Sequence, residues 1–462
     1  MDIKQYIEEN WESVEQDIAH MIAIPSIEEM DKASETEPFG PQPRVALDEI
    51  LKIADRMGMD VQPCDNYCGV VDVAGKDDQE FAIVAHVDVV PAGPGWSTEP
   101  YSLVKRDGYY LGRGVEDDKG PAIIALWAVK YFMDNKIKLN HKVRFIFGSN
   151  EESGMGAVKK YVAENPQPDF MMTPDAEFPI ICGEKGIVHG QVDFKFPSDS
   201  LIKNIEGGAA KNAVPGEAFA VVEADFDSLK DIKGLEVSDL GDGTVKILAH
   251  GVSGHASMPE GTTNAIRLLI DYLVDNDLVS DCDTSWIEFA KKLLTDSYGK
   301  GLGIACEEDF LGKLTCVGSM IGIENGVCTI TIDIRYPGAI TKDEIFDAMD
   351  KNIASFGGKF TAGHTENSHL VDPQDSKVQA LLKGYIDTTG KDATPIAIGG
   401  GTYAKRFDRS VAFGPCELEV VKPEWAGSMH GPNEAIAIDD LKNAMEVYIR
   451  AIQNVMELDL RA

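Results

Sequence analysis

Basic side chains are scarce in this sequence. Its 462 residues include 43 Lys and Arg against 77 Asp and Glu, so the formal net charge is −34. A surface this acidic repels the phosphates of nucleic acids and of anionic lipids, since like charges raise the free energy of association. We therefore expect neither nucleic acid nor a membrane surface among its partners.

Long apolar runs and paired cysteines are missing as well. No stretch approaches the roughly 18 apolar residues of a membrane-spanning helix. The N-terminal segment MDIKQYIEENWESVEQD lacks the basic and apolar stretches of a secretory signal. The eight cysteines are scattered without a CxxC pair, so neither a zinc finger nor a disulfide framework is supported. Together these absences predict a cytoplasmic protein with reduced thiols.

The first part of the chain alternates between strand and helix patterns. Apolar residues three and four apart predict an N-terminal helix from Ile3 to Ile18. Residues 31–44, rich in Pro, Gly and charge, are typical of a loop. Further along we expect strands at 81–90 and 142–150 and helices at 121–136 and 158–163. This alternation predicts an α/β fold, a mixed sheet flanked by helices.

The pattern changes near residue 186. In residues 328–337 apolar and polar side chains alternate, which is typical of an antiparallel strand with one solvated face. Helices are expected between such strands, at 264–274 and 342–355, and strand–helix alternation returns from 372 to a last helix at 439–455. We therefore predict a discontinuous outer domain of residues 1–186 and 371–462, with an α+β domain of residues 187–370 inserted in it.

Side chains suited to binding metal follow several of the predicted strands. His86 and Asp88 end one strand, and Asp117 and Asp118 lie in a glycine-rich turn before a helix. Alone, the first pair is more often a satisfied strand end, and an acid before a helix is more often its cap. Together, at one edge of one sheet, they favour a metal site.

More such side chains follow later in the chain. Glu151 and Glu152 end another strand, Asp175 follows the next, and His430 lies in a Gly/Pro turn. The adjacent glutamates alone would be read as a solvated acidic turn, whereas buried together they would repel unless a cation lay beside them. Two histidines and up to five carboxylates suit two divalent ions that share one carboxylate.

These segments, in their order, resemble a known family. AHVDVVPAG, GRGVEDDKG, NEESG, PDAEFP and MHGPNE are similar to the di-metal exopeptidases that include aminoacylases, glutamate carboxypeptidase and succinyl-diaminopimelate desuccinylase. Within that family the chain most resembles the bacterial PepV-type dipeptidases, over nearly its whole length. The resemblance also covers KNAVP, GHAS, DIRYP and GGGTYAK in the later segments.

The resemblance implies a role for each matching residue. His86 and Asp175 would bind one ion, Glu152 and His430 the other, and Asp117 would bridge the two, while Asp118 stays unassigned. The catalytic residues would be Glu151 as general base, Asp88 as the partner that orients His86, and His255 as a donor to the oxyanion. The inserted domain would be a ferredoxin-like lid, and the substrate-binding residues implied are Asn212, Arg335 and Gly400.

The expected activity is hydrolysis of unblocked dipeptides, including Xaa-His and β-alanyl types, by two divalent ions per chain. Zinc is the expected metal, although histidine and carboxylate ligands also accept Mn²⁺ and Co²⁺. Two alternatives stay open. The chain could be an aminoacylase or desuccinylase acting on N-acyl amino acids, or a metal-dependent peptide-binding protein. Asp88 could also hold a substrate amine, which an acylase does not need.

Overall fold

The computed structural model describes residues 2–64, 66–230, 232–418 and 420–462. The chain divides into two compact units. Unit 1 comprises Met1–Cys182, Val371–Ile396 and Gly401–Ala462, and unit 2 comprises Gly183–Leu370 and Ala397–Gly400. The segment predicted as an insertion, 187–370, thus falls within unit 2, which also takes in the short segment that carries Gly399 and Gly400.

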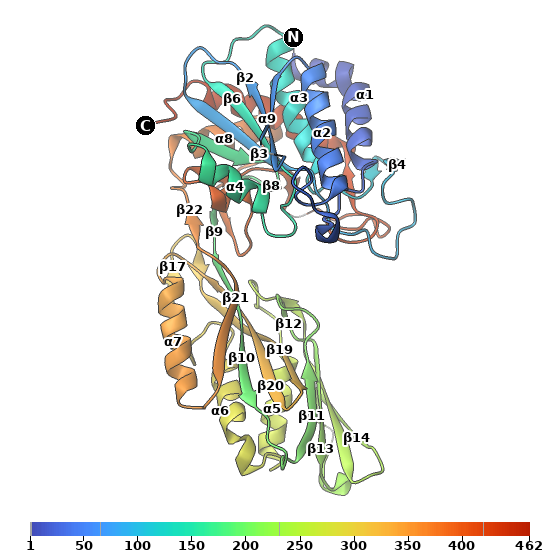
Figure 1. The fold of residues 1–462 in the computed structure, drawn as a ribbon, viewed down its shortest axis with the longest axis vertical. Helices are drawn as coiled ribbons and strands as arrows, with labels where there is room; N and C mark the ends of the chain where they lie inside the picture. Colours follow the sequence, from blue (N-terminus) through green and yellow to red (C-terminus); the bar gives the residue numbers. More distant parts are fainter. Residues whose placement is uncertain (1, 65, 231, 419) are drawn as a thin grey trace. The chain divides into compact units, whose positions relative to one another are not determined.

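Unit 1 is built on a mixed sheet (Figure 1). Its strands lie in the order β1-β2-β6-β3-β7-β24-β9, and β22 and β23 pair with β9 where the chain passes to unit 2. Strands β6, β3, β7 and β24 are parallel, whereas β1, β2 and β9 run antiparallel to their neighbours. The bounds are β1 Asp60–Cys64, β2 Cys68–Val73, β3 Glu80–His86, β6 Lys142–Gly148, β7 Phe170–Thr173, β9 Ile181–Glu184, β22 His369–Leu370, β23 Ile396–Ile398 and β24 Ser410–Ala412.

Helices cover both faces of this sheet. One face packs on α4, with Val158 and Tyr161 against Val84 and Ile146, and α2 contacts β2 from the other side. The bounds are α1 Ile3–Ile22, α2 Pro41–Arg56, α3 Lys119–Asp134, α4 Gly156–Glu164, α8 Ser376–Thr389 and α9 Ile438–Val455. The mixed sheet flanked by helices is confirmed.

The N-terminal helix forms as its periodicity predicts, since Tyr6, Trp11 and Ile18 all lie on its buried face. The loop predicted at 31–44 is too long, because α2 begins at Pro41. Proline suits the first helical position, where its missing N–H would have had no partner. Because prolines were interpreted as loop residues, the predicted loop extends past the start of α2.

Two small sheets order the loops of unit 1. Strand β26 (Ala435–Ala437) pairs with β5 (Tyr109–Leu111), which pairs with β4 (Val104–Arg106). Strand β8 (Ala176–Phe178) pairs with β25 (Pro415–Glu417). Because Ala435 lies opposite Leu111, the turn before β26 meets the turn after β5. Segments more than 300 residues apart in sequence are thereby brought together.

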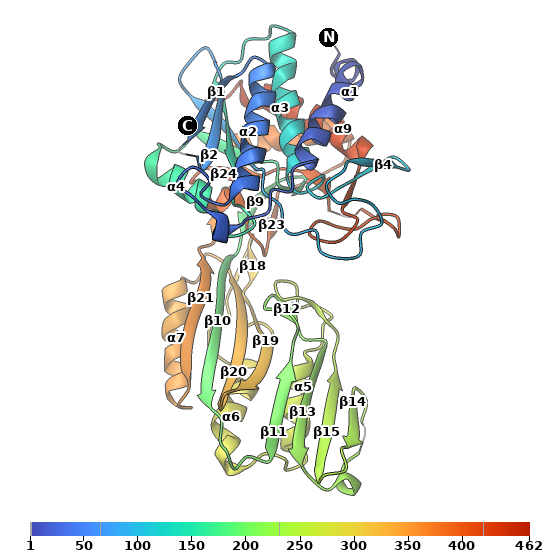
Figure 2. The ribbon, with the colours of Figure 1, turned by 45° about the vertical axis from the view of Figure 1, so that its right-hand side comes forward.

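Unit 2 contains an antiparallel sheet in the order β14-β15-β13-β11-β19-β20-β10-β21 (Figure 2). In the half β19-β20-β10-β21, β20 lies between β10 and β19, as in a split βαβ arrangement. The strand bounds are β10 Gly186–Lys195, β11 Ile202–Gly207, β13 Glu217–Glu223, β14 Leu235–Asp239, β15 Thr244–His250, β19 Thr315–Glu324, β20 Val327–Tyr336 and β21 Lys359–Glu366.

One face of this sheet carries the core of unit 2. Helices α5 (Ala265–Asp275), α6 (Thr284–Leu293) and α7 (Lys342–Ala354) pack there. On β20, Ile330, Ile332 and Ile334 are all buried in this core, as predicted, but the opposite face is not solvated throughout, because Asp333 and Arg335 are buried as well. Short pairs β12 (Ala213–Val214) with β16 (Gly254–His255), and β17 (Glu307–Glu308) with β18 (Gly312–Lys313), complete the unit.

Two further features bear on the expectations from composition. Among the described residues, no helix is both long and apolar enough to cross a membrane. Free thiols are carried by Cys182, Cys282, Cys306, Cys316, Cys328 and Cys416. The side chain of Cys64 lies outside the described part.

Candidate functional site

The parallel strands of unit 1 end at one edge of the sheet, and the predicted metal ligands follow them there. His86 is the last residue of β3, and Asp175 comes shortly after β7. Glu151 and Glu152 follow β6. The carboxyl ends of parallel strands share one edge, which is where ligands bind in open α/β sheets. The strand order thus explains how side chains about 90 residues apart come together.

Asp117 lies between two histidines. Its Oδ1 is 2.8 Å from Nε2 of His86, and its Oδ2 is 2.9 Å from Nε2 of His430. The two oxygens of one carboxylate therefore face two different imidazoles. This is the arrangement expected of a carboxylate that bridges two ions.

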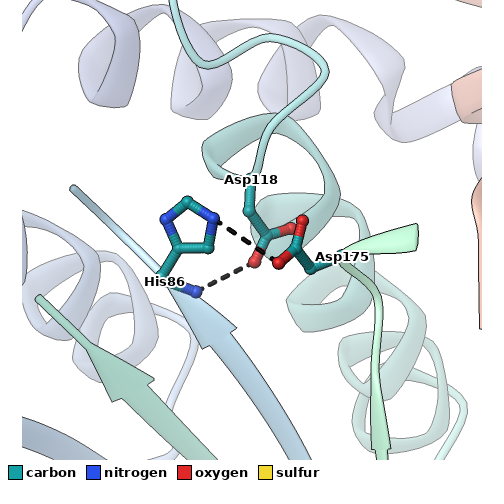
Figure 3. Close-up of side chains that lie close together, drawn as sticks. All are labelled: His86, Asp118 and Asp175. Carbon is teal, nitrogen blue, oxygen red and sulfur yellow. Dashed lines mark hydrogen bonds and ion pairs between the residues drawn. The ribbon is translucent and has the colours of Figure 1, made fainter. Parts of the chain in front are cut away.

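Each histidine has a second carboxylate beside it. Asp175 Oδ2 is 3.6 Å from Nε2 of His86, and Figure 3 shows this pair. Glu152 Oε2 is 3.0 Å from Nε2 of His430. The structure thus brings together all five residues that the sequence suggested as ligands, as two sets joined at Asp117.

Asp118, which the sequence left unassigned, lies in the same cluster. Its Oδ2 accepts a hydrogen bond from the main-chain N–H of His86 at 2.9 Å (Figure 3). Its Oδ1 is buried and has no hydrogen-bond partner. Candidate ligand atoms of His86, Asp118 and Asp175 all lie within 4.8 Å of one another, as do those of His86, Asp117 and Glu152.

Asp88 contacts both His86 and the glutamate turn. Its main-chain oxygen is 3.1 Å from Nδ1 of His86, and its Oδ1 is 3.5 Å from the same nitrogen. Because both neighbours of Nδ1 are acceptors, Nδ1 carries a proton, and Nε2 is the nitrogen that a metal ion could bind. The carboxylate of Asp88 also accepts the N–H groups of Glu151 and Glu152, at 3.0 and 3.1 Å. It is buried and engaged on both oxygens, which argues against a contact with a substrate amine.

The charges of the cluster are unbalanced. Burial and the charge of Asp117 raise the pKa of Asp175 to about 8. Burial also raises the pKa of Glu151, and the charges of Asp175 and Glu152 add to the rise. Hydrogen bonds to Asp117 and Glu152 raise the pKa of His430 to about 10. Burial alone would lower the pKa of His86, but the charge of Asp175 and the hydrogen bond to Asp117 raise it well above its usual value.

These shifts have a common cause, because buried carboxylates outnumber cations in this cluster. Two imidazole lone pairs aimed at carboxylate oxygens would repel them unless a proton or a metal ion lay between. Imidazole nitrogen with carboxylate oxygen is a donor set for zinc and similar divalent ions. The residues present therefore fit a pair of such ions.

Unit 2 holds a second polar cluster, centred on Arg335. The guanidinium binds both carboxylate oxygens of Asp333, at 2.6 and 2.8 Å, and donates to the main-chain oxygen of Gly399 at 2.9 Å. His189 adds a contact to Asp333 at 3.0 Å. Arg335 is buried, and three of its five N–H groups are engaged in these bonds.

His255 lies in this unit on the short strand β16. Its Nδ1 accepts the main-chain N–H of Ser257 at 3.2 Å and lies 2.7 Å from the hydroxyl oxygen of the same residue. An Nδ1 that accepts leaves the proton on Nε2, which is then a hydrogen-bond donor. Partial burial and the charge of Arg335 lower the pKa of His255, which favours this neutral form.

The other two predicted substrate-binding residues belong to unit 2 as well. Asn212 is exposed beside His255, and its main-chain oxygen accepts the N–H of Ala256 at 2.9 Å. A Cβ on Gly400 would meet only a side-chain carbon of Ile398, at 3.8 Å, whereas one on Gly399 would lie 2.3 Å from Cβ of Ser257. The position that requires glycine is therefore Gly399, next to the predicted one.

Four residues beside these sites were given no role from the sequence. Glu434 and Arg113 form a buried pair beside Asp117, and Ser257 and Asp333 hold His255 and Arg335. All four lie inside the quoted segments MHGPNE, GRGVEDDKG, GHAS and DIRYP. Their position within those segments was a signal, but nothing in the sequence showed which partner each would meet.

Comparison with solved structures shows the same fold. Human carnosine dipeptidase 1 aligns with a TM-score of 0.59 at 14% identity, covering 99% of this chain and 98% of that one. The aminoacylhistidine dipeptidase of Vibrio alginolyticus aligns with a TM-score of 0.60 at 13% identity, covering 95% of both chains. At such identities these matches concern the fold alone.

Comparison of sequences shows closer relationship. The chain is 33% identical over 471 aligned positions to the Beta-Ala-Xaa dipeptidase of Lactobacillus delbrueckii subsp. lactis, with 98% of both chains covered. The profile of peptidase family M20/M25/M40 matches residues 82–454, a range that contains every predicted site residue. The resemblance found in the sequence is thereby confirmed, and the chain belongs to peptidase family M20/M25/M40.

Proposed function

We propose that this metallopeptidase hydrolyses the peptide bond of unblocked dipeptides with broad side-chain specificity, including Xaa-His and β-alanyl substrates. The observation that carries the proposal is the Asp117 carboxylate, which faces His86 with one oxygen and His430 with the other. The relative named Beta-Ala-Xaa dipeptidase supports the substrate class, because it matches the chain over nearly its full length. We also propose a cytoplasmic location, and the free thiols of Cys182, Cys282, Cys306, Cys316, Cys328 and Cys416 agree with it.

We assign the metal ligands as two sets that share Asp117. His86 and Asp175 would hold one ion, and Glu152 and His430 the other, with zinc as the expected metal. A divalent ion supplies a water of lowered pKa and polarises the substrate carbonyl. Asp88 serves this centre by holding the Nδ1 proton of His86, so that Nε2 is the nitrogen available for binding.

Glu151 is the proposed general base. Asp88 accepts the N–H groups of Glu151 and Glu152 and so holds the main chain of the turn that carries both carboxylates. Burial raises the pKa of Glu151, and a carboxylate of raised pKa accepts a proton from water more readily. Glu151 would take that proton and later pass it to the leaving amine.

Unit 2 is proposed to act as the lid that supplies the substrate contacts. His255, a neutral donor through Nε2, would stabilise the developing oxyanion. Arg335 is held rigidly by Asp333 and Gly399 and keeps N–H groups for a substrate carboxylate. Asn212 and Gly400 would complete these contacts. A lid that recognises both ends of a dipeptide explains why the substrate must be unblocked.

A hydrolysis screen tests the substrate class. The substrates offered are free dipeptides, tripeptides, N-acetylated dipeptides, N-acetyl amino acids and N-succinyl amino acids, each with enzyme loaded with Zn²⁺, Mn²⁺ or Co²⁺. We expect cleavage of free dipeptides, little cleavage of tripeptides and none of N-acetylated dipeptides. Turnover of N-acyl amino acids with little turnover of dipeptides would make the chain an aminoacylase or desuccinylase. Tight binding without any turnover would favour the peptide-binding alternative.

Elemental analysis tests the metal centre separately. Active, dialysed protein should contain close to two divalent ions per chain. A single tight ion, with no gain in activity when more metal is added, would contradict the two-ion assignment. The most active metal in the screen then identifies which of the three the site uses.

A further inference from the structure

A buried ion pair lies next to the proposed metal centre and has no role in the chemistry described so far. Arg113 and Glu434 are 1% and 0% exposed, and NH1 of the arginine binds Oε2 of the glutamate. Removing two charges from water costs several kcal/mol per ion, so a buried pair stabilises a fold poorly. Its presence beside the ligands calls for another explanation.

The second oxygen of Glu434 holds the turn that carries Asp117. Its Oε1 accepts the main-chain N–H groups of Gly114 and Glu116, both at 3.0 Å, and that of Asp117 at 3.3 Å. Three donors converging on one oxygen leave this turn little freedom. The carboxylate of Glu434 thus determines where the main chain places Asp117.

The second terminal nitrogen of Arg113 holds the loop that carries His430. It donates to the main-chain oxygens of His430 and Gly431, both at 3.2 Å. The side chain of His430 is 54% exposed, and its φ of 62° lies in the left-handed region. Burial therefore does little to hold His430 in place. Its position depends instead on the hydrogen bonds that Arg113 donates to this loop.

We infer that the Arg113–Glu434 pair is a positioning element that fixes the distance between Asp117 and His430. It joins the two turns through charged, well-shielded hydrogen bonds, which are stronger than neutral ones. It thereby sets the affinity of the ion bound by His430, Glu152 and Asp117, and affects the ion at His86 and Asp175 less. This inference rests on the metal centre of the proposed function.

Cobalt titration of two matched variants tests it. Glu434→Gln keeps the shape of the side chain but places an amide against Arg113. The control is Asp17→Asn, which changes another buried carboxylate of unit 1, one bound by Arg56 and the indole of Trp127. Absorption of bound Co²⁺ reports each site, and thermal unfolding of the metal-free proteins reports stability.

We expect the control to bind two Co²⁺ ions, each with the affinity that wild-type protein shows. Glu434→Gln should bind one ion normally and the other about 10- to 100-fold more weakly, with an altered visible spectrum. Arg113→Lys keeps the charge but cannot bond several oxygens at once, so it should weaken binding of the same ion. This variant replaces Glu434→Gln in the test if Glu434→Gln does not fold.

Two results would overturn the inference. Wild-type affinity for both ions in Glu434→Gln and Arg113→Lys would make the pair merely structural, even if unfolding temperatures fell. If the affinities for both ions fell equally, in the control as well, the pair would again be merely structural. If wild-type protein bound fewer than two ions, the metal centre of the proposed function would fail first, and the inference with it.

Discussion

The two units gather their functional side chains in different ways. In unit 1, parallel strands deliver His86, Asp175 and the glutamate turn to one sheet edge from distant parts of the chain. In unit 2, all described pairs of the main sheet are antiparallel, and Asp333 on β20 lies opposite His189 on the adjacent β10 and contacts it. Parallel connections collect loops at one edge, whereas antiparallel pairing places partners directly opposite each other.

The units also differ in the charge balance of their buried polar clusters. Unit 1 buries carboxylates whose mutual repulsion a cation would relieve, and burial with the charge of Asp117 raises the pKa of Asp175. In unit 2 the Arg335–Asp333 pair balances its own charge. Burial raises the pKa of Asp333, but the hydrogen bonds and charges of Arg335 and His189 together lower it below its usual value. We therefore expect variants of unit 1 to change metal content and variants of unit 2 to change turnover alone.

Replacing the bridging residue should have the largest effect. Asp117→Asn removes the charge that both histidines face, so both ions should bind weakly and activity should fall to background. Elemental analysis after dialysis and a dipeptide assay measure this. Full occupancy of both sites in Asp117→Asn would show that Asp117 does not bridge them.

Replacing the proposed base should separate chemistry from metal binding within unit 1. Glu151→Gln should keep two ions per chain while kcat falls by about 10²- to 10⁴-fold, because only proton transfer is lost. Glu152→Gln is the matched control, since it should weaken one ion and recover partly with added metal. Near wild-type turnover in Glu151→Gln would reject the assignment of the base.

In unit 2, His255→Ala should lower kcat by about 10²- to 10³-fold, the usual cost of one oxyanion donor. Metal content and unfolding temperature should stay close to wild type, and KM should change less than kcat. Loss of metal would instead place His255 among the ligands. Variants of unit 2 would then change metal content as variants of unit 1 do. Normal kcat would make it an ordinary surface residue.

The smallest expected effect concerns the orientation of His255. Ser257→Ala removes the hydroxyl from Nδ1 but keeps the main-chain donor, so the Nε2–H tautomer survives. One hydrogen bond is worth about 0.5–1.5 kcal/mol, which corresponds to a roughly two- to tenfold lower kcat. The double variant with His255→Ala should show no further loss. A loss that adds in full would mean that Ser257 acts independently of His255.

Local pattern predicted much of this molecule correctly. The apolar face of α1 and the alternation in β20 follow from the periods of helix and strand, which each short segment carries in itself. The five proposed ligands were suggested because each lies in one of the motifs that carry the family resemblance. The start of α2 was missed because Pro41 both ends loops and begins helices.

The sequence by itself determined which residue types are available and which family they resemble. The tertiary structure alone decided that Asp117 faces both histidines, that Asp118 buries an unpartnered oxygen in the same cluster, and that Glu434 reaches back to the Asp117 turn. These partners lie tens to hundreds of residues apart. Their contacts depend on strand order and on the register of β26 with β5, which no local pattern encodes.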